Sequence, residues 1–509
     1  MNKTSSNQQM IINLGAAIVV FLVNALISFF LSPFIVRELG AEANGFVQLA
    51  MNFVSYIAII MAALNSMSSR FMTVAYHSKN YTKMNEYYSS TFAGNNIIIL
   101  ILLIPVTLGI IFLEHLIQIS PELVYQVKGL FFLVFVNYFV STGTPNWDVA
   151  FFATNKIYLQ SLGTILSYVV RAITIIILYA FFPTEVWYVG LASIFATLVL
   201  QIWLYMGMRR EFPEVKFRLK YVKVSAIKDL VSSGIWNSVS QLGFTLSNGL
   251  NLLITNVFIG STQMGIVSLS MIVPTVITSL QLAVSNTFAP NLTILFTKRK
   301  ISEMVSEIYK AGKLTLIIIG LPLAGFIIFG KPFFHLWLPT QDASQLQILS
   351  VLTMVNLVLI NGSQALLQIF VVINKNRPSA LSVVIGGVAT VLITLLALVT
   401  TNWGIYAVVG VSSIISMLRY LIFVIPFSAK YLGLEWYKFF PLVGYSVLTL
   451  IVNLIVGWIV SLFIVINSWT TLVIAAAIFA IIAGLVSSYI VFNKSERKYI
   501  LSIISSRIR

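Results

Sequence analysis

Cysteine is absent from the 509-residue sequence, and histidine occurs only three times. Without cysteine the chain has no disulfide, no thiolate nucleophile and no cysteine-ligated metal. The three histidines, His77, His115 and His335, lie far apart in the sequence and lack metal-ligand spacing. No Walker A sequence, catalytic triad or HExxH sequence occurs either. We therefore predict no enzyme activity, no metal site and no cofactor.

Charged residues are also scarce, at 9% of the chain against 59% hydrophobic residues. Soluble globular chains carry about 25% charged residues, so this chain lacks the polar surface that water requires. Apolar segments of about 20 residues, long enough to cross a bilayer, recur along the whole sequence. We predict an all-α polytopic membrane protein with about fourteen transmembrane helices, near residues 11–36, 46–67, 91–113, 125–152, 158–181, 187–208, 233–259, 265–287, 313–337, 345–372, 379–400, 404–426, 441–465 and 470–492.

The net charge of +16 is distributed unevenly along the chain. Lysine and arginine concentrate in one alternating set of loops and in the two termini; the exceptions are Arg37, Lys128, Lys331, Arg171 and Arg419. This asymmetry is the positive-inside pattern of membrane proteins, and it argues against nucleic acid as a partner. It predicts that both termini lie in the cytoplasm and that the basic loops face anionic membrane lipids.

An internal duplication is visible in the sequence. Residues 130–162 align without gaps with residues 349–381, and the polar identities Asn137/Asn356, Asn155/Asn374 and Lys156/Lys375 are not expected from hydrophobicity alone. Residues 40–50 align with 260–270 at nearly the same offset, with Gly40/Gly260 and Gly45/Gly265 identical. An even number of spans per repeat makes the repeats parallel, and such bundles normally bracket a cavity.

We therefore expect two parallel six-helix repeats around a central cavity, followed by two C-terminal helices. The predicted domains are an N-terminal bundle (1–208), a basic cytoplasmic linker with an amphipathic helix (209–232), a C-terminal bundle (233–428), and two extra helices with a basic cytoplasmic tail (429–509). Two amphipathic stretches, Val222–Ser232 and Tyr499–Ile508, have the composition of helices that lie on anionic lipid.

Three sequence segments resemble the multidrug/oligosaccharidyl-lipid/polysaccharide exporter superfamily, and within it the Wzx-type polysaccharide flippases. They are PFIVRELGAEANGFVQLA (33–50), ALNSMSSRFMTVAY (63–76) and FFATNKIYLQSL (151–162). The resemblance covers essentially the whole length. It implies a flippase in a bacterial cell membrane that moves an undecaprenyl-pyrophosphate-linked oligosaccharide from the cytoplasmic to the outer leaflet. Its implied partners are glycosyltransferases and a polymerase of the same pathway.

Ionisable groups inside a bilayer are costly, and each is a candidate for function. Arg171 lies roughly 20 Å from the cytoplasmic end of its span at 1.5 Å per residue, too deep to reach water easily. We expect it to face the cavity, with Asp148 as a possible charge partner or ion-coupling group. Arg419 lies nearer a cytoplasmic end, where its side chain could also reach the membrane surface.

Other residues are candidates to bind the substrate at the cavity entrance or wall. Arg70 and Lys375 lie at cytoplasmic span ends, where they serve either topology or pyrophosphate binding. The amides of Asn65 and Asn286, near the ends of equivalent spans, could bond sugar hydroxyls or join helices. Arg37 is expected to pair with its neighbour Glu38.

Alternative functions remain. A cation-coupled multidrug exporter of the same superfamily needs an acidic residue in the first or seventh span, and neither predicted span contains one. A positive cavity instead attracts an anion. A lipid II or teichoic-acid-type flippase fits the count of fourteen helices. A membrane-embedded glycosyltransferase would need surface carboxylates and a large outer loop, and a passive scaffold would not explain a buried arginine.

Overall fold

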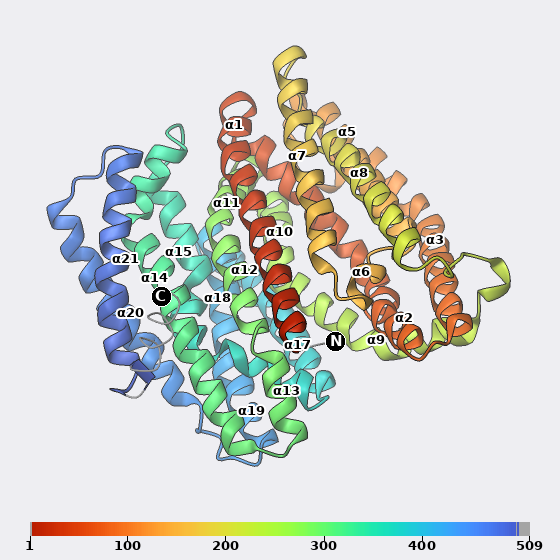
Figure 1. The fold of residues 1–509 in the computed structure, drawn as a ribbon. Helices are drawn as coiled ribbons and strands as arrows, with labels where there is room; N and C mark the ends of the chain where they lie inside the picture. The colour runs from red at the N-terminus through yellow and green to blue at the C-terminus, as the bar shows by residue number, and fades with distance from the viewer. Residues whose placement is uncertain (1–2, 495, 498–509) are drawn as a thin grey trace. The chain divides into compact units, whose positions relative to one another are not determined.

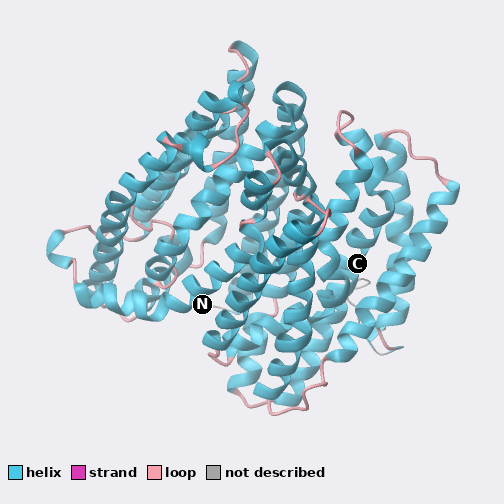
Figure 2. Cartoon of the chain, turned by 180° about the vertical axis from the view of Figure 1, so that it is seen from behind, coloured by secondary structure: helices cyan, strands magenta, loops and turns pink. Residues whose placement is uncertain are grey.

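The computed structural model describes residues 3–494, 496 and 497, and helices dominate it (Figures 1 and 2). No strand occurs among these residues. Two compact units divide the chain. Unit 1 comprises residues 1–245 and 252–266, and unit 2 comprises residues 246–251 and 267–509. The predicted tail helix Tyr499–Ile508 lies outside the described residues.

Unit 1 is built mainly from long helices joined by short turns. The helix α9 packs along α1, and α7 packs between α1 and α8. The helices of this unit are α1 (Lys3–Asn65), α2 (Ser68–His77), α3 (Tyr81–Ile111), α4 (Leu113–Leu116), α5 (Val124–Gly143), α6 (Val149–Ala153), α7 (Ile157–Phe181), α8 (Tyr188–Glu211), α9 (Val224–Phe244) and α10 (Asn251–Phe258), with short 3₁₀ turns at Pro121–Leu123 and Leu219–Tyr221.

Unit 2 contains the remaining helices, apart from the first residues of α11. Its two C-terminal helices pack against each other, and both contact α14. The helices are α11 (Ser261–Ser270), α12 (Ile272–Asn286), α13 (Ala289–Thr297), α14 (Ile301–Trp337), α15 (Ala343–Ile360), η4 (Asn361–Leu366), α16 (Leu367–Val372), α17 (Asn376–Thr400), α18 (Ile405–Arg419), the π-helix η5 (Tyr420–Val424), α19 (Ile425–Tyr431), α20 (Phe440–Phe463) and α21 (Trp469–Val491).

Twelve helical stretches in the described part of the chain are long and apolar enough to cross a membrane. The first runs for 63 residues, long enough to contain the two spans predicted near 11–36 and 46–67. The helix α1 bends within it at Gly40, whose φ of 84° only glycine adopts readily. The stretch over α9 and α10 is not counted, because polar residues and a π-helix at 245–249 interrupt it. These two features account for the difference from about fourteen predicted spans, and the all-α polytopic fold is confirmed.

The duplication recurs in the backbone. Four described residues other than glycine have a positive φ, and they form two pairs: Lys79 with Arg299, and Asn155 with Asn374. Gly40 and Gly260 also both have positive φ. The helices that follow Asn155 and Asn374, α7 and α17, are each 25 residues long. Each turn thus occupies the position that the sequence alignment assigns to its counterpart.

Two repeat-equivalent glycines of unit 1, Gly45 and Gly265, lie against each other. A Cβ added to Gly45 would lie 2.9 Å from the Cα of Gly265, and one added to Gly265 would lie 2.5 Å from the carbonyl oxygen of Ala41. Small residues let helix backbones approach this closely inside a membrane. Any larger side chain at either position would force the backbones apart.

The contact-defined units begin and end at different residues from the predicted bundles, because α9 packs along α1. The predicted domain boundaries follow the repeat rather than compactness, and they remain a prediction. The predicted amphipathic helix Val222–Ser232 corresponds to the start of α9. Its apolar residues Ala226 and Leu230 are buried in the core of unit 1, so this face packs on protein instead of on lipid.

Candidate functional site

Arg171 lies in the middle of α7, in unit 1. Its Nε is buried and has no hydrogen-bond partner among the described residues. No ion pair joins Arg171 to Asp148 or to any other described acidic side chain. A buried cationic group without a partner is costly, so Arg171 stays a candidate to bind an anion.

The residue after Arg171 on α7 lines an apolar groove, although Arg171 itself does not. The groove has a volume of about 570 Å³ and lies between α1 and α7, with Ala172 in its wall. Phe30 on α1 and Ile176 on α7 are well exposed within it. The other lining residues are Leu26, Ile27, Leu31, Phe34, Ile175, Tyr179 and Ala180. The combination suits a ligand with a long apolar chain and an anionic group.

Arg419 is the last residue of α18, in unit 2. Its guanidinium carbon lies 5.0 Å from the centroid of the Tyr420 ring, and its buried Nη1 has no hydrogen-bond partner among the described residues. Tyr420 opens the π-helix η5 and donates a hydrogen bond of 2.5 Å to Gln364 Oε1. Because π-helices often mark functional positions, Arg419 stays a candidate in its own unit.

The other predicted site residues have more ordinary surroundings. Asn65 exchanges hydrogen bonds of 2.9 and 3.1 Å with Asn95 of α3, so its amide joins two helices. Asn286 is exposed and accepts a hydrogen bond of 2.8 Å from Gln368. Arg70, on α2, and Lys375, which precedes α17, are exposed. Arg37 pairs with Glu38 at 2.9 Å, as expected.

The predicted site residues are divided between the two units. Asn65, Arg70, Asp148 and Arg171 belong to unit 1, whereas Asn286, Lys375 and Arg419 belong to unit 2. Their roles in binding remain predictions.

A second feature of unit 1 was not predicted. A cavity of about 780 Å³ lies between α3, the segment before α6, the end of α8 and residues 215–218 of the linker. Aromatic and basic side chains line it, among them Tyr88, Trp147 and Arg209. The basic run after residue 208 predicts cytoplasmic topology and contact with anionic lipid, but not a cavity. The aromatic residues beside it are far apart along the chain, and only a comparison of the two repeats distinguishes them.

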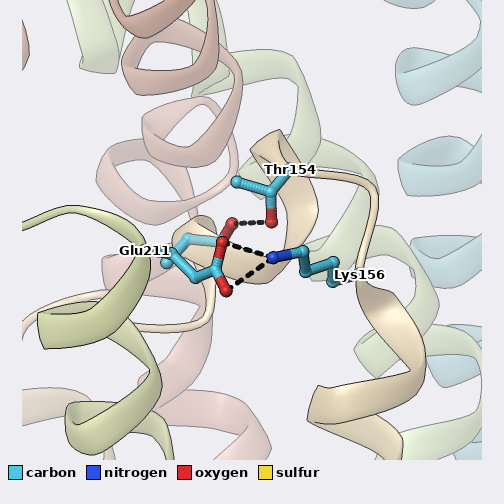
Figure 3. A network of polar contacts seen from close by, with 4 residues as sticks. Thr154, Lys156 and Glu211 are labelled. Atoms are coloured by element: carbon cyan, nitrogen blue, oxygen red, sulfur yellow. Dashed lines mark hydrogen bonds and ion pairs between the residues drawn. The ribbon is translucent and has the colours of Figure 1, made fainter. Parts of the chain in front are cut away.

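An ion pair next to this cavity occurs in unit 1 only. Lys156 Nζ lies 2.7 Å from both carboxylate oxygens of Glu211, and Thr154 donates a hydrogen bond of 2.7 Å to the carbonyl of Ala150 (Figure 3). The Glu211 side chain is only 13% exposed. The pair joins the turn before α7 to the end of α8. In unit 2 the equivalent Lys375 forms no ion pair with a described acidic residue.

Comparisons with known proteins agree with this fold. A family model described as "Polysaccharide biosynthesis protein" matches residues 11–292. A curated protein of Bacillus subtilis (strain 168), "Uncharacterized membrane protein EpsK", is 24% identical over 490 residues, covering 96% of this chain and 97% of that one.

Solved structures show the same fold at low sequence identity. An inward-facing multidrug resistance MATE family transporter of the MOP superfamily has a TM-score of 0.65 at 15% identity, over 83% of this chain and 98% of that one. The lipid II flippase MurJ, in an inward closed conformation, has a TM-score of 0.62 at 16% identity, over 93% of this chain and 98% of that one.

Proposed function

Because the chain belongs to the polysaccharide biosynthesis protein family, we propose that it is a flippase for an undecaprenyl-pyrophosphate-linked oligosaccharide. In this proposal it carries the lipid-linked repeat unit from the cytoplasmic to the outer leaflet of a bacterial cell membrane by alternating access around a central cavity. Both termini face the cytoplasm. Glycosyltransferases supply the substrate, and a polymerase consumes it.

The observation that carries this proposal is Arg171, whose buried Nε has no hydrogen-bond partner among the described residues. Guanidinium forms paired hydrogen bonds with phosphate oxygens. A pyrophosphate would therefore accept the hydrogen bonds of Arg171 that no described residue accepts. The neighbouring apolar groove between α1 and α7 would hold the first isoprene units of the same molecule. Apolar chain and anionic head would thereby bind next to each other on one helix.

The membrane potential favours the proposed direction. With the inside negative, each negative charge that crosses outward gains about 2.3 kcal/mol per 100 mV. The candidate residues Asn65, Asn286, Arg70, Lys375 and Arg419 would contact the head group along the path, and Asp148 would couple an ion.

A second candidate is a lipid II or teichoic-acid-type flippase. The likeness to MurJ extends over 93% of this chain, against 83% for the MATE transporter. Such a substrate also joins a polyprenyl chain to a phosphate and a glycan, so its demands on Arg171 are the same. The cation-coupled drug exporter is less favoured, because residues 11–36 and 233–259 contain no acidic residue to bind a cation.

Transport in proteoliposomes tests the proposal. With a fluorescent undecaprenyl-pyrophosphate-linked glycan, Arg171→Ala should abolish flipping and Arg171→Lys should restore it only in part, since an ammonium lacks the planar fork. Expression should be intact, because removal of an unpaired buried charge does not cost stability. Arg37→Ala, which removes an exposed arginine, is the matched control. Normal flux in Arg171→Ala would refute the anion-binding role.

A further inference from the structure

The 780 Å³ cavity of unit 1 has a wall made by the linker, and that wall is fixed in place. Asn85 on α3 accepts a hydrogen bond of 2.7 Å from the backbone N–H of Lys216. The hydroxyl of Ser89 accepts one of 3.4 Å from the backbone N–H of Arg218. One helix turn of α3 thus holds the linker backbone across the opening.

Three cations line this cavity: Arg209, Lys216 and Arg218. All three are exposed, and none forms an ion pair with a described acidic side chain. The nearby Glu211 is bound to Lys156 and is therefore not free to neutralise them. The cluster holds a local excess of positive charge, which attracts an anion.

Aromatic rings line the same cavity. Trp147 donates a hydrogen bond of 3.0 Å from Nε1 to the hydroxyl of Tyr88, and its ring lies 5.2 Å from that of Tyr205. Arg209 donates from Nε to the Tyr205 hydroxyl at 3.0 Å. Flat rings with fixed orientation, set beside cations, provide a surface for a sugar ring and a partner for its phosphate.

The duplicated unit offers an internal control. The left-handed pairs Lys79/Arg299 and Asn155/Asn374 assign Tyr88 to Ile308 and Trp147 to Leu366. Counted back from the last residues of α8 and α19, which are Glu211 and Tyr431, Tyr205 corresponds to Ile425 and Arg209 to Ala429. All four counterparts are fully buried members of one apolar core in unit 2. Unit 2 thus has apolar side chains where unit 1 has aromatic and basic ones. Tyr88 is also a buried member of the core of unit 1, and Trp147 packs against that core.

We propose that this cavity binds a phosphorylated sugar, with the phosphate on Arg209, Lys216 and Arg218 and the sugar ring against Trp147 and Tyr205. The site is separate from Arg171 and, if the chain is a flippase as proposed above, it receives the substrate head group before transport. The same chemistry is present in a lipid-linked sugar phosphate and in a soluble one. The inference rests on the proposed function only for its place in transport.

Calorimetric titration of the full-length protein in detergent tests the binding. Glucose 1-phosphate should bind at least about tenfold more tightly than glucose or inorganic phosphate. Replacement of Arg209, Lys216 and Arg218 together by glutamine should weaken glucose 1-phosphate at least about tenfold. The matched control replaces Arg210, Lys220 and Lys223, basic residues of the same segment outside the cavity lining, and should stay within about twofold.

Equal affinity for glucose 1-phosphate in the cavity variant and the control would overturn the inference, and so would inorganic phosphate binding as tightly as the sugar phosphate. Thermal unfolding of both variants checks that they remain folded. A parallel titration with geranyl phosphoglucose distinguishes a lipid-linked sugar phosphate from a soluble one as the ligand. Affinity at least about tenfold tighter than for glucose 1-phosphate identifies a lipid-linked ligand, and equal affinity identifies a soluble one.

Flipping and binding measurements on the parent protein separate this inference from the proposed function. Parent protein that binds glucose 1-phosphate at this cavity but flips no lipid-linked glycan would refute the flippase and leave the binding site. A parent protein that flips but has no affinity for glucose 1-phosphate would refute the binding site and leave the flippase.

Discussion

Unit 1 and unit 2 share two left-handed turns and the length of the helices α7 and α17, yet equivalent ends of the two units differ in chemistry. In unit 2 the region is a closed apolar core in which Phe439 and Leu442, from the start of the appended α20 region, pack with Ile308 and Leu366. In unit 1 the linker takes that role with Phe212 and Val215, and beside them an aromatic and basic cavity stays open. The two copies thus keep equivalent turns, while equivalent positions belong to an apolar core in unit 2 and line a cavity in unit 1.

The strongest test of this difference introduces a cation into the apolar core of unit 2. Ala429→Arg would place an unpaired cation where the parent side chain is fully buried, at a cost of about 3 kcal/mol or more. The reverse change at the equivalent position, Arg209→Ala, should alter stability by less than about 0.5 kcal/mol because Arg209 is exposed. Thermal unfolding in detergent measures both. Equal stability of the two variants would contradict the comparison.

The next test gives unit 1 the residues of unit 2. Tyr88→Ile, Trp147→Leu, Tyr205→Ile and Arg209→Ala together should lower the affinity for glucose 1-phosphate at least about 100-fold, or about 2.7 kcal/mol. Because both partners of the Trp147–Tyr88 hydrogen bond are replaced, the fold should survive. Calorimetry measures the affinity. Tyr205→Phe alone, which keeps the ring, is the control and should lose much less; unchanged binding in the fourfold variant would end the proposal.

A third test concerns the ion pair between Lys313 and Glu496 in unit 2, here called the clamp. Lys313 of α14 is buried and lies 2.7 Å from Glu496, whereas its repeat counterpart is Ala93. Partial burial raises the pKa of the Glu496 carboxyl, but the hydrogen bond from Lys313 and other local contacts outweigh it, so the net pKa lies below its ordinary value. Glu496→Gln should cost about 2 kcal/mol at neutral pH.

The sign of the pH dependence follows from that lowered pKa. The clamp contributes its full stability above the ordinary glutamate pKa of about 4.3, and it loses this as the pH falls through the lower folded-state value. The difference in melting temperature between the parent and Glu496→Gln should therefore shrink on acidification. Glu303→Gln, in an exposed pair with Lys300, is the control and should show almost no effect. A constant difference across this pH range would contradict the clamp.

The smallest predicted effect has opposite signs in the two units. A Cβ on Gly190 of α8 would lie 2.8 Å from the Cβ of Leu133, whereas one on Gly410 of α18 would meet no atom within 4 Å. Gly410→Ala should therefore stabilise the protein by up to about 1 kcal/mol, the helix-propensity gain. Gly190→Ala should destabilise it by about 1 kcal/mol through overpacking. Melting temperatures that shift in the same direction would show that the two positions are not distinguished by packing.

Hydropathy and the repeat predicted most of the fold. The apolar segments located most membrane helices, and the Asn155/Asn374 alignment located turns that share a left-handed residue. The packing of α9 along α1 could not be predicted, because its polar residues resemble those of a surface linker. The sequence also does not show which of its many asparagine side chains form hydrogen bonds between helices. Only the structure shows that Asn65 is hydrogen-bonded to Asn95.

The site was predicted less completely. Arg171 stood out because one charge in an apolar segment needs no alignment to be noticed. The cavity of Tyr88, Trp147 and Tyr205 did not, since its residues come from three helical regions and each alone looks like an interface aromatic. A comparison of equivalent positions in the two repeats would have been the available signal. In that alignment the aromatic residues correspond to the aliphatic residues Ile308, Leu366 and Ile425.

The left-handed residues Lys79 and Arg299 have a consequence for protein engineering. At φ of 57° and 56° a lysine or arginine holds a backbone shape that glycine would adopt without strain. Both copies nevertheless have a long basic side chain there, in agreement with the predicted positive-inside pattern. Glycine at these two turns should raise the thermal stability of the finished protein, and a neighbouring added lysine would preserve the signal for insertion.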